Sequence, residues 1–167
     1  MNNAQQPTPP VIGPGWAAPV SEPEPPAAKP VKGWVAVVVS VLLGALMGVV
    51  AVLWQGWSTV LTSPAVIVLP WGALLGVLAV FFTAVAWGLR AARRWVPGVI
   101  GLVAFAVLAL VSLDQHNLLI APMDARYFQV APGAVWSAFV VTGGVVVATL
   151  AALLIVARHV PAPRAQR

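Results

Sequence analysis

The residues whose types and spacing could support acid–base or metal chemistry lie between positions 114 and 124. Asp114 and His116 are two positions apart, and Asp124 follows in the same segment. A carboxylate beside an imidazole can transfer protons, and such a set can also bind a metal ion weakly. The chain has no cysteine, and its other histidine, His159, lies far along the sequence. We therefore interpret the three residues as a solvated surface and predict no catalytic, cofactor or metal site.

The sequence around this segment is strongly apolar. Hydrophobic residues make up 60% of the chain and charged residues 8%, against about 45–50% and about 25% in soluble domains. No Asp, Glu, Lys or Arg occurs in 33–89, 95–113 or 127–157. A helix that crosses the hydrocarbon core needs about 20 such residues. The fold class predicted is all-α, a membrane-embedded four-helix bundle, rather than a soluble enzyme.

The uncharged runs divide into four spans inside a transmembrane domain at 33–157. The run 33–89 is too long for one span and suits two spans joined by a polar turn at 55–64. The predicted spans cover about 34–54, 65–89, 96–113 and 134–157. An arginine-rich link at 90–94 joins the second span to the third, and a loop at 114–133 joins the third to the fourth.

Three segments lie outside the spans. The tail 1–32 is rich in proline, which removes backbone donors, so we expect it to be disordered. Its PxxP spacings would alternatively dock an aromatic groove. In the outer loop, the apolar stretches 118–120 and 127–130 would lie on the outer leaflet, cover the bundle mouth or meet a partner. The basic tail 158–167 ends the chain.

Basic residues predict the orientation, because they resist translocation across the membrane. In an even-span layout, Arg126 is the one Lys or Arg placed outside. The determinants near span ends on the other side are Lys29, Lys32, Arg90, Arg93, Arg94 and Arg158. We expect a multi-pass protein of the plasma (inner) membrane with both termini cytoplasmic. Nucleic acid is not an expected partner, because these basic residues flank membrane spans instead of forming one displayed patch.

Tryptophans give an independent check of the span ends. Indole rings collect in the headgroup layer, where the ring is apolar and the N–H stays hydrated. Those at or near predicted span ends are Trp34, Trp54, Trp57, Trp87, Trp95 and Trp136. We expect them to form an aromatic belt.

Small residues recur at every fourth position in three spans, which places them on one helix face. The stripes are Ser40, Gly44 and Gly48; Gly72 and Gly76; and Gly144, Ala148 and Ala152. Such stripes let helix backbones approach closely in lipid. They would pack within the chain's own bundle or dock against another subunit or a second copy.

The polar groups inside the predicted spans are hydroxyls, and no ionisable residue lies there. Proton- and ion-coupled transporters usually place a charged group in the membrane. Serine and threonine hydroxyls more often bond the carbonyl of the preceding helical turn than carry a substrate. The alternative is a hydroxyl-lined path around Thr83, Thr142 and Thr149.

The layout of residues 34–157 resembles that of small uncharacterised four-span membrane proteins of actinobacteria. The resemblance rests on the Pro-rich tail, the four spans, the arginine-rich link followed by Trp-Val-Pro-Gly at 95–98, and one mid-sized loop. It implies a four-helix membrane fold and no particular activity.

The function predicted is that of a non-enzymatic integral membrane protein, an accessory or scaffold subunit of a larger membrane assembly. Its partners would be the lipid bilayer and a membrane protein or a second copy of the chain, with no cofactor. The alternative is a small transporter or lipid-handling membrane protein.

Overall fold

The computed structural model describes residues 31–62, 66–113 and 132–161. Expectations for the Pro-rich tail up to position 30, including Lys29, lie outside the described residues. So do those for Asp114, His116 and Asp124 in the loop and for the end of the basic tail.

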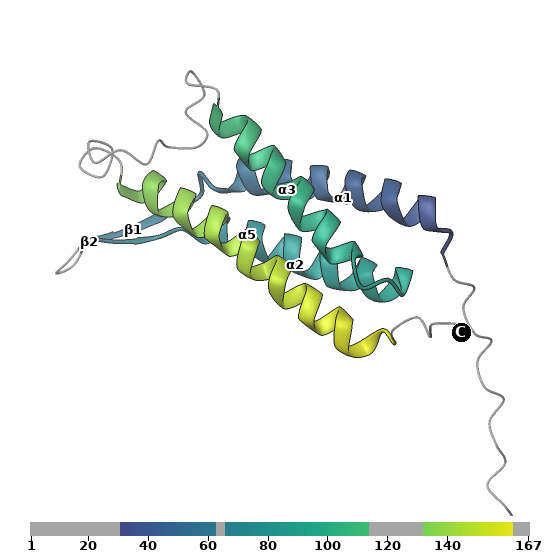
Figure 1. Cartoon of the computed structure of the whole chain (residues 1–167). Coiled ribbons are helices and arrows are strands. Elements are labelled where there is room, and N and C mark those ends of the chain that lie inside the picture. Colours follow the sequence, from purple (N-terminus) through teal and green to yellow (C-terminus); the bar gives the residue numbers. More distant parts are fainter. Residues whose placement is uncertain (1–30, 63–65, 114–131, 162–167) are drawn as a thin grey trace, which may run out of the picture.

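Four helices make up most of the described part of the chain (Figure 1). They are α1 (Gly33–Trp54), α2 (Trp71–Ala91), α3 (Val96–Leu113) and α5 (Pro132–His159). The predicted four-helix fold is confirmed. Each helix is long and apolar enough to cross a membrane, which suggests a multi-pass membrane protein.

Prolines mark the starts of three helices. Pro70 lies directly before α2, Pro97 is the second residue of α3, and Pro132 is the first residue of α5. Proline has no N–H and a fixed φ, which suits the first turn, where backbone donors have no acceptor within the helix. Pro161 follows the end of α5.

A β-hairpin replaces the expected start of the second span. The strands β1 (Thr59–Thr62) and β2 (Val66–Leu69) pair antiparallel, with Thr59 opposite Leu69. The second span was expected from position 65, but α2 begins at Trp71, so the expectation for 66–69 is wrong. Val-Ile-Val-Leu is rich in β-branched residues, which favour a strand, and the helix starts only after Pro70.

The helices form a ring whose order differs from their order in the chain. α1 packs against α2 and α3, α5 packs against α2 and α3, and α1 and α5 lie at opposite corners. Gly44 and Gly48 of α1 lie against Ile100 and Ala104 of α3 in the same order, so these two helices are parallel. Val77 and Gly88 of α2 lie against Gly144 and Val156 of α5 in the same order, so these two helices are also parallel, and they run opposite to α1 and α3.

The bundle therefore has two distinct ends. The arginine end holds Lys32, residues 90–95 and the last turn of α5 at Arg158, and it includes every Lys and Arg of the described residues. The hairpin end holds the end of α1, the two strands and the start of α5. Figure 1 shows the hairpin extending beyond the helices at that end.

Candidate functional site

The small-residue stripe of α1 faces α3. A Cβ atom on Gly44 would lie 2.7 Å from the carbonyl oxygen of Ile100, and one on Gly48 would lie 2.8 Å from Cβ of Val107. Ser40, Gly44 and Gly48 are all buried. Backbones that approach this closely gain dispersion contact over the whole crossing. The structure thus places this stripe at a contact inside the chain.

The stripe of α2 faces the end of α1. Gly72 lies directly against the carbonyl oxygen of Trp54, and a Cβ on Gly76 would lie 3.0 Å from Cα of Ala51. A larger residue at either position would push the two helices apart. This close crossing lets α2 return along α1 after the hairpin.

The stripe of α5 includes a contact with α2. A Cβ atom on Gly144 would lie 2.5 Å from Cγ2 of Val77, and Ala148 and Ala152 are buried further along the helix. The glycines of all three stripes therefore meet other helices of the same chain. Docking against a second protein would need other surfaces.

A polar contact joins α1 and α2 within the helical bundle. Trp87 Nε1 donates a hydrogen bond to Ser40 Oγ at 3.2 Å, and Ser40 Oγ donates to the carbonyl oxygen of Ala36 at 2.5 Å. Trp87 was expected in the headgroup belt, but its ring is half-buried against the bundle and its N–H is satisfied by Ser40. A buried indole N–H needs such an acceptor.

Other hydroxyls bond their own helix, as expected. Thr149 Oγ1 donates to the carbonyl oxygen of Val145 at 2.7 Å, and Ser112 Oγ donates to that of Ala109 at 2.7 Å. Thr83 and Thr142 are half-buried on α2 and α5. Of the three threonines in the alternative path, Thr149 therefore already uses its hydroxyl hydrogen in a bond to its own helix.

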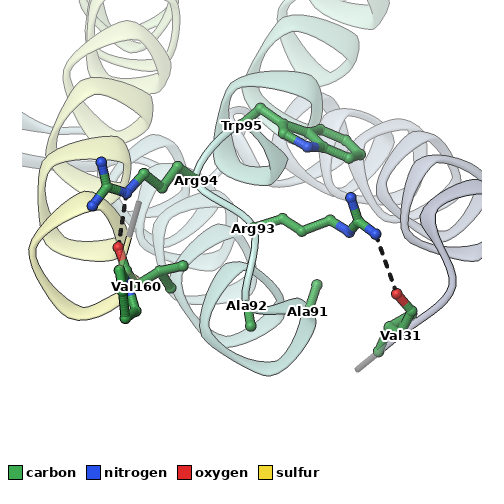
Figure 2. Close-up of a pocket in the computed structure, with 8 residues that line it drawn as sticks. Val31, Ala91, Ala92, Arg93, Arg94, Trp95 and Val160 are labelled. Atoms are coloured by element: carbon green, nitrogen blue, oxygen red, sulfur yellow. Dashed lines mark hydrogen bonds between the residues drawn. The ribbon is translucent and has the colours of Figure 1, made fainter. Parts of the chain in front are cut away.

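A pocket of about 360 Å³ opens at the arginine end (Figure 2). Its walls come from three separate parts of the chain, because the start of α1, the link after α2 and the end of α5 meet here. The lining is formed by residues 91–95, Val31, Val160 and Pro161. We call it the arginine pocket.

Two arginines of the link bind the flanking chain segments. Arg93 Nη2 donates to the carbonyl oxygen of Val31 at 3.5 Å, and Arg94 Nε donates to that of Val160 at 2.7 Å. The Arg93 guanidinium carbon also lies 6.0 Å from the centre of the Trp95 ring. Figure 2 shows the two side chains extending to opposite sides of the link. The topology residues of the link are therefore also structural ties.

A residue with a left-handed backbone conformation ends α2, directly before these arginines. Ala92 has φ 51° and ψ 42°, and it is the one non-glycine residue with positive φ in the described part of the chain. Its N–H donates to the carbonyls of Gly88 and Leu89, and the N–H of Arg93 donates to that of Gly88 at 3.4 Å. This is the usual helix-ending motif with alanine where glycine is preferred.

Two buried polar side chains lie at the hairpin end. Gln55 is 5% exposed and Ser137 is 2% exposed. The amide atoms of Gln55 and the hydroxyl of Ser137 have no hydrogen-bond partner among the described residues. Leaving such groups unsatisfied costs about 1–3 kcal/mol each. Close by, the Trp54 and Trp57 rings stack with their centres 6.5 Å apart.

An apolar groove of about 420 Å³ runs along the outside of the bundle between α3 and α5. Gly98 and Leu153 line its part nearest the arginine end, and Gly101 and Thr149 line it further along the two helices. Large side chains such as the exposed Leu102 and Leu150 flank it.

Sequence reasoning missed the roles of two residues and one contact in these sites. Gln55 was treated as part of a polar turn, although a lone amide within a long uncharged run is itself a signal of burial or contact. The helix-ending role of Ala92 has no marker in the sequence, because glycine is the usual residue there. The partner of Trp87 required knowledge of which helices are neighbours.

Candidate metal ligands and known relatives give no further assignment. Among the residues that the structure describes, no group of three or more His, Cys, Asp or Glu side chains could hold a metal ion. Comparison of the chain with protein-family models, with curated proteins and with solved structures gives no match.

Proposed function

We propose that the chain is a non-enzymatic integral membrane protein that serves as an accessory or scaffold subunit of a larger membrane assembly. The observation that carries this proposal is the hairpin, which extends from one end of a four-helix bundle (Figure 1).

The hairpin has the properties of a contact element. A sheet of two strands is marginally stable alone, and each strand has one edge whose backbone groups no other described strand pairs. Trp57 at its base is 66% exposed and Leu61 in β1 is 49% exposed. Strand addition by a partner would pair the open edge and cover these side chains.

The bundle supplies the rigid support that such an element needs. The close glycine contacts of α1, α2 and α5 and the bond from Trp87 to Ser40 fix the helices to one another.

We further propose that the protein lies in the plasma (inner) membrane, with both termini cytoplasmic and the hairpin outside. The support is the position of the described Lys and Arg residues at the opposite end. Membership among the small four-span actinobacterial proteins is likewise a proposal that rests on layout.

Purification of the tagged chain from its native membranes in mild detergent tests the subunit proposal. We expect a protein, or a second copy of the chain, to co-purify in a fixed ratio. Replacing residues 59–69 by a Gly/Ser segment of equal length should abolish that association while the four helices remain.

The matched control changes exposed apolar residues in the arginine-end half of α1, as in Val38→Ala with Leu42→Ala. This variant should retain the partner. A full-length chain that runs alone and monomeric in repeated preparations contradicts the subunit proposal. Retention of the partner after hairpin replacement contradicts the hairpin as the contact.

The second candidate is a small transporter or lipid-handling membrane protein, and the groove between α3 and α5 favours it because Thr149 lines that groove. Reconstituted protein should then move a solute or lipid between vesicle compartments. Replacing Thr83, Thr142 and Thr149 by valine should abolish the movement. Flux equal to that of empty vesicles removes this candidate.

A further inference from the structure

Arg94 has unused hydrogen-bond donors at the mouth of the arginine pocket. A guanidinium group carries five N–H donors in a planar fork. The described contacts of Arg94 use Nε alone, which donates to Val160, and the side chain is exposed. Figure 2 shows its terminal nitrogens pointing away from that bond. They are free to bind an acceptor.

The charge at this end has no counterpart within the described residues. Lys32, Arg90, Arg93, Arg94 and Arg158 all lie at the arginine end. The four acidic residues of the chain, at positions 22, 24, 114 and 124, fall outside the described ranges. An anion bound here would meet a local excess of positive charge.

The pocket combines this charge with apolar walls. Val160 and Ala91 line it with buried side chains, and the Trp95 ring lies beside Arg93. If the helices cross a bilayer, this end lies in the headgroup layer, where basic pockets between helices bind anionic lipid headgroups. Free inorganic phosphate gains nothing from apolar walls, whereas a lipid does.

The groove between α3 and α5 starts within a few residues of the link. Arg94 bonds the end of α5, and the groove starts at Gly98, four residues after Arg94, with Leu153 on the facing helix. Leu153 precedes Val160 by seven residues, about two turns or ~10 Å along α5. A phospholipid that binds Arg94 through its phosphate would therefore place a part of its acyl chain beyond the ester group in this groove.

We propose that the chain binds one anionic phospholipid, with the lipid phosphate on the free donors of Arg94 and an acyl chain in the α3–α5 groove. Arg93 holds the link in place through Val31 and Trp95 and is not the phosphate ligand. This site is separate from the proposed partner contact at the hairpin end.

Lipid titration of the purified full-length protein, followed by native mass spectrometry, tests the site with phosphatidylglycerol and with phosphatidylcholine as the neutral comparison. Arg94→Gln should weaken phosphatidylglycerol binding roughly tenfold. The matched control Arg90→Gln removes the same charge at the same end from an exposed side chain that does not line the pocket, and it should weaken binding by about threefold or less. Arg94→Lys, which keeps the charge but loses the planar fork, should give an intermediate loss.

Gly98→Leu tests the acyl-chain part. A Cβ there would lie 3.7 Å from Cδ2 of Leu153, an ordinary contact, and Gly98 lines the groove, so the larger side chain is expected to occupy the start of the groove. It should weaken phosphatidylglycerol binding although Arg94 is intact. Circular dichroism and size-exclusion profiles like those of the unaltered chain establish that each variant is folded.

Equal losses for Arg94→Gln and Arg90→Gln would show diffuse attraction to the basic end and overturn the proposal. Displacement of the lipid by millimolar inorganic phosphate alone would identify a free-phosphate site and also overturn it. Unchanged lipid binding in Gly98→Leu would exclude the groove as the acyl-chain site.

Discussion

Gly101 on α3 shows how closely single positions control the bundle. A Cβ atom placed on Gly101 would overlap the Thr149 side chain of α5, whereas one on Gly98, a turn away on the same helix, would make only an ordinary contact with Leu153. Both are glycines of the same helix, but the space around Gly101 is filled, whereas the space around Gly98 is open enough for a methyl group. A test of close packing can therefore compare two identical substitutions on one helix.

We predict that Gly101→Ala lowers the free energy of unfolding by about 1–3 kcal/mol, because the added methyl overpacks the α3–α5 contact. Gly98→Ala should leave it unchanged or raise it slightly, since alanine favours helix by up to ~1 kcal/mol. Denaturant titration of helicity in detergent micelles measures both. Equal effects of the two substitutions would refute the close contact at Gly101.

Ala92 offers the opposite kind of prediction, a substitution that stabilises. Its left-handed conformation costs an L-residue about 1–2 kcal/mol, while glycine adopts it freely. Ala92→Gly should raise the free energy of unfolding by about 0.5–1 kcal/mol, after allowance for the greater entropy of the unfolded glycine chain. The neighbouring Ala91→Gly, at the buried last residue of α2, should lower it by up to ~1 kcal/mol. Denaturant titration of helicity measures both free energies of unfolding, and a lower value for Ala92→Gly than for the unaltered chain contradicts the prediction.

Spacing in the sequence predicted which residues form small-residue faces, but not what they contact. Residues four apart share a helix face, so Gly44 and Gly48 could be assigned to one stripe. That the stripe meets Ile100 on α3 depends on the ring order, which no local pattern encodes. The end of α2 at Ala92 was equally hidden, because an alanine carries no signal for a left-handed turn.

At the scale of elements, the polar contact between α1 and α2 can be measured directly. Trp87 donates to Ser40, and both are held at the arginine-end half of the bundle. We predict a coupling free energy of about 0.5–1.5 kcal/mol in a double-mutant cycle of Ser40→Ala and Trp87→Phe, the range found for hydrogen bonds between membrane helices. Unfolding of the four proteins in micelles gives this value.

The control cycle pairs Trp87→Phe with Ser112→Ala. Ser112 is exposed on α3 and bonds its own helix through Ala109, so its effect should add to that of Trp87 without coupling. A coupling near zero for Ser40 as well would mean that the bond contributes nothing to stability.

The hairpin was missed for a definite physical reason. Val66–Leu69 is apolar and lies directly before an apolar helix, so the two segments read as one hydrophobic run. Hydropathy alone does not distinguish a short apolar strand from part of a helix. The β-branched residues of that run and the proline at position 70 were the available signals. The third span, in contrast, was expected at 96–113 and is observed at Val96–Leu113, since a charged link bounds one side and Asp114 the other.

The ring order is the part of the fold least accessible to sequence. α1 and α3 are parallel neighbours although α2 lies between them in the chain. The link 92–95 is short enough only because Gly88 lets α2 approach Pro97 of α3 at that end. None of the four helices has one distinct apolar face, so hydropathy does not indicate which helices are neighbours. The arrangement follows instead from contacts between specific small residues.

For the molecule as a whole, the separation of charge between the two ends predicts its orientation. Basic residues at the arginine end resist translocation, so this end should face the cytoplasm. The chain has no cysteine, so one introduced cysteine reports its position without interference. Leu61 in the hairpin and His159 at the end of α5 are exposed and lie at opposite ends of the bundle.

We predict that Leu61→Cys reacts with a membrane-impermeant maleimide in intact cells, while His159→Cys reacts only after the membrane is permeabilised. The unaltered chain is the control for labelling of other groups. Labelling of His159→Cys in intact cells would reverse the orientation, and it would also place Arg94 in the other leaflet. Labelling of both cysteines in intact cells would instead contradict a bundle that separates two compartments, because its two ends would then lie on the same side.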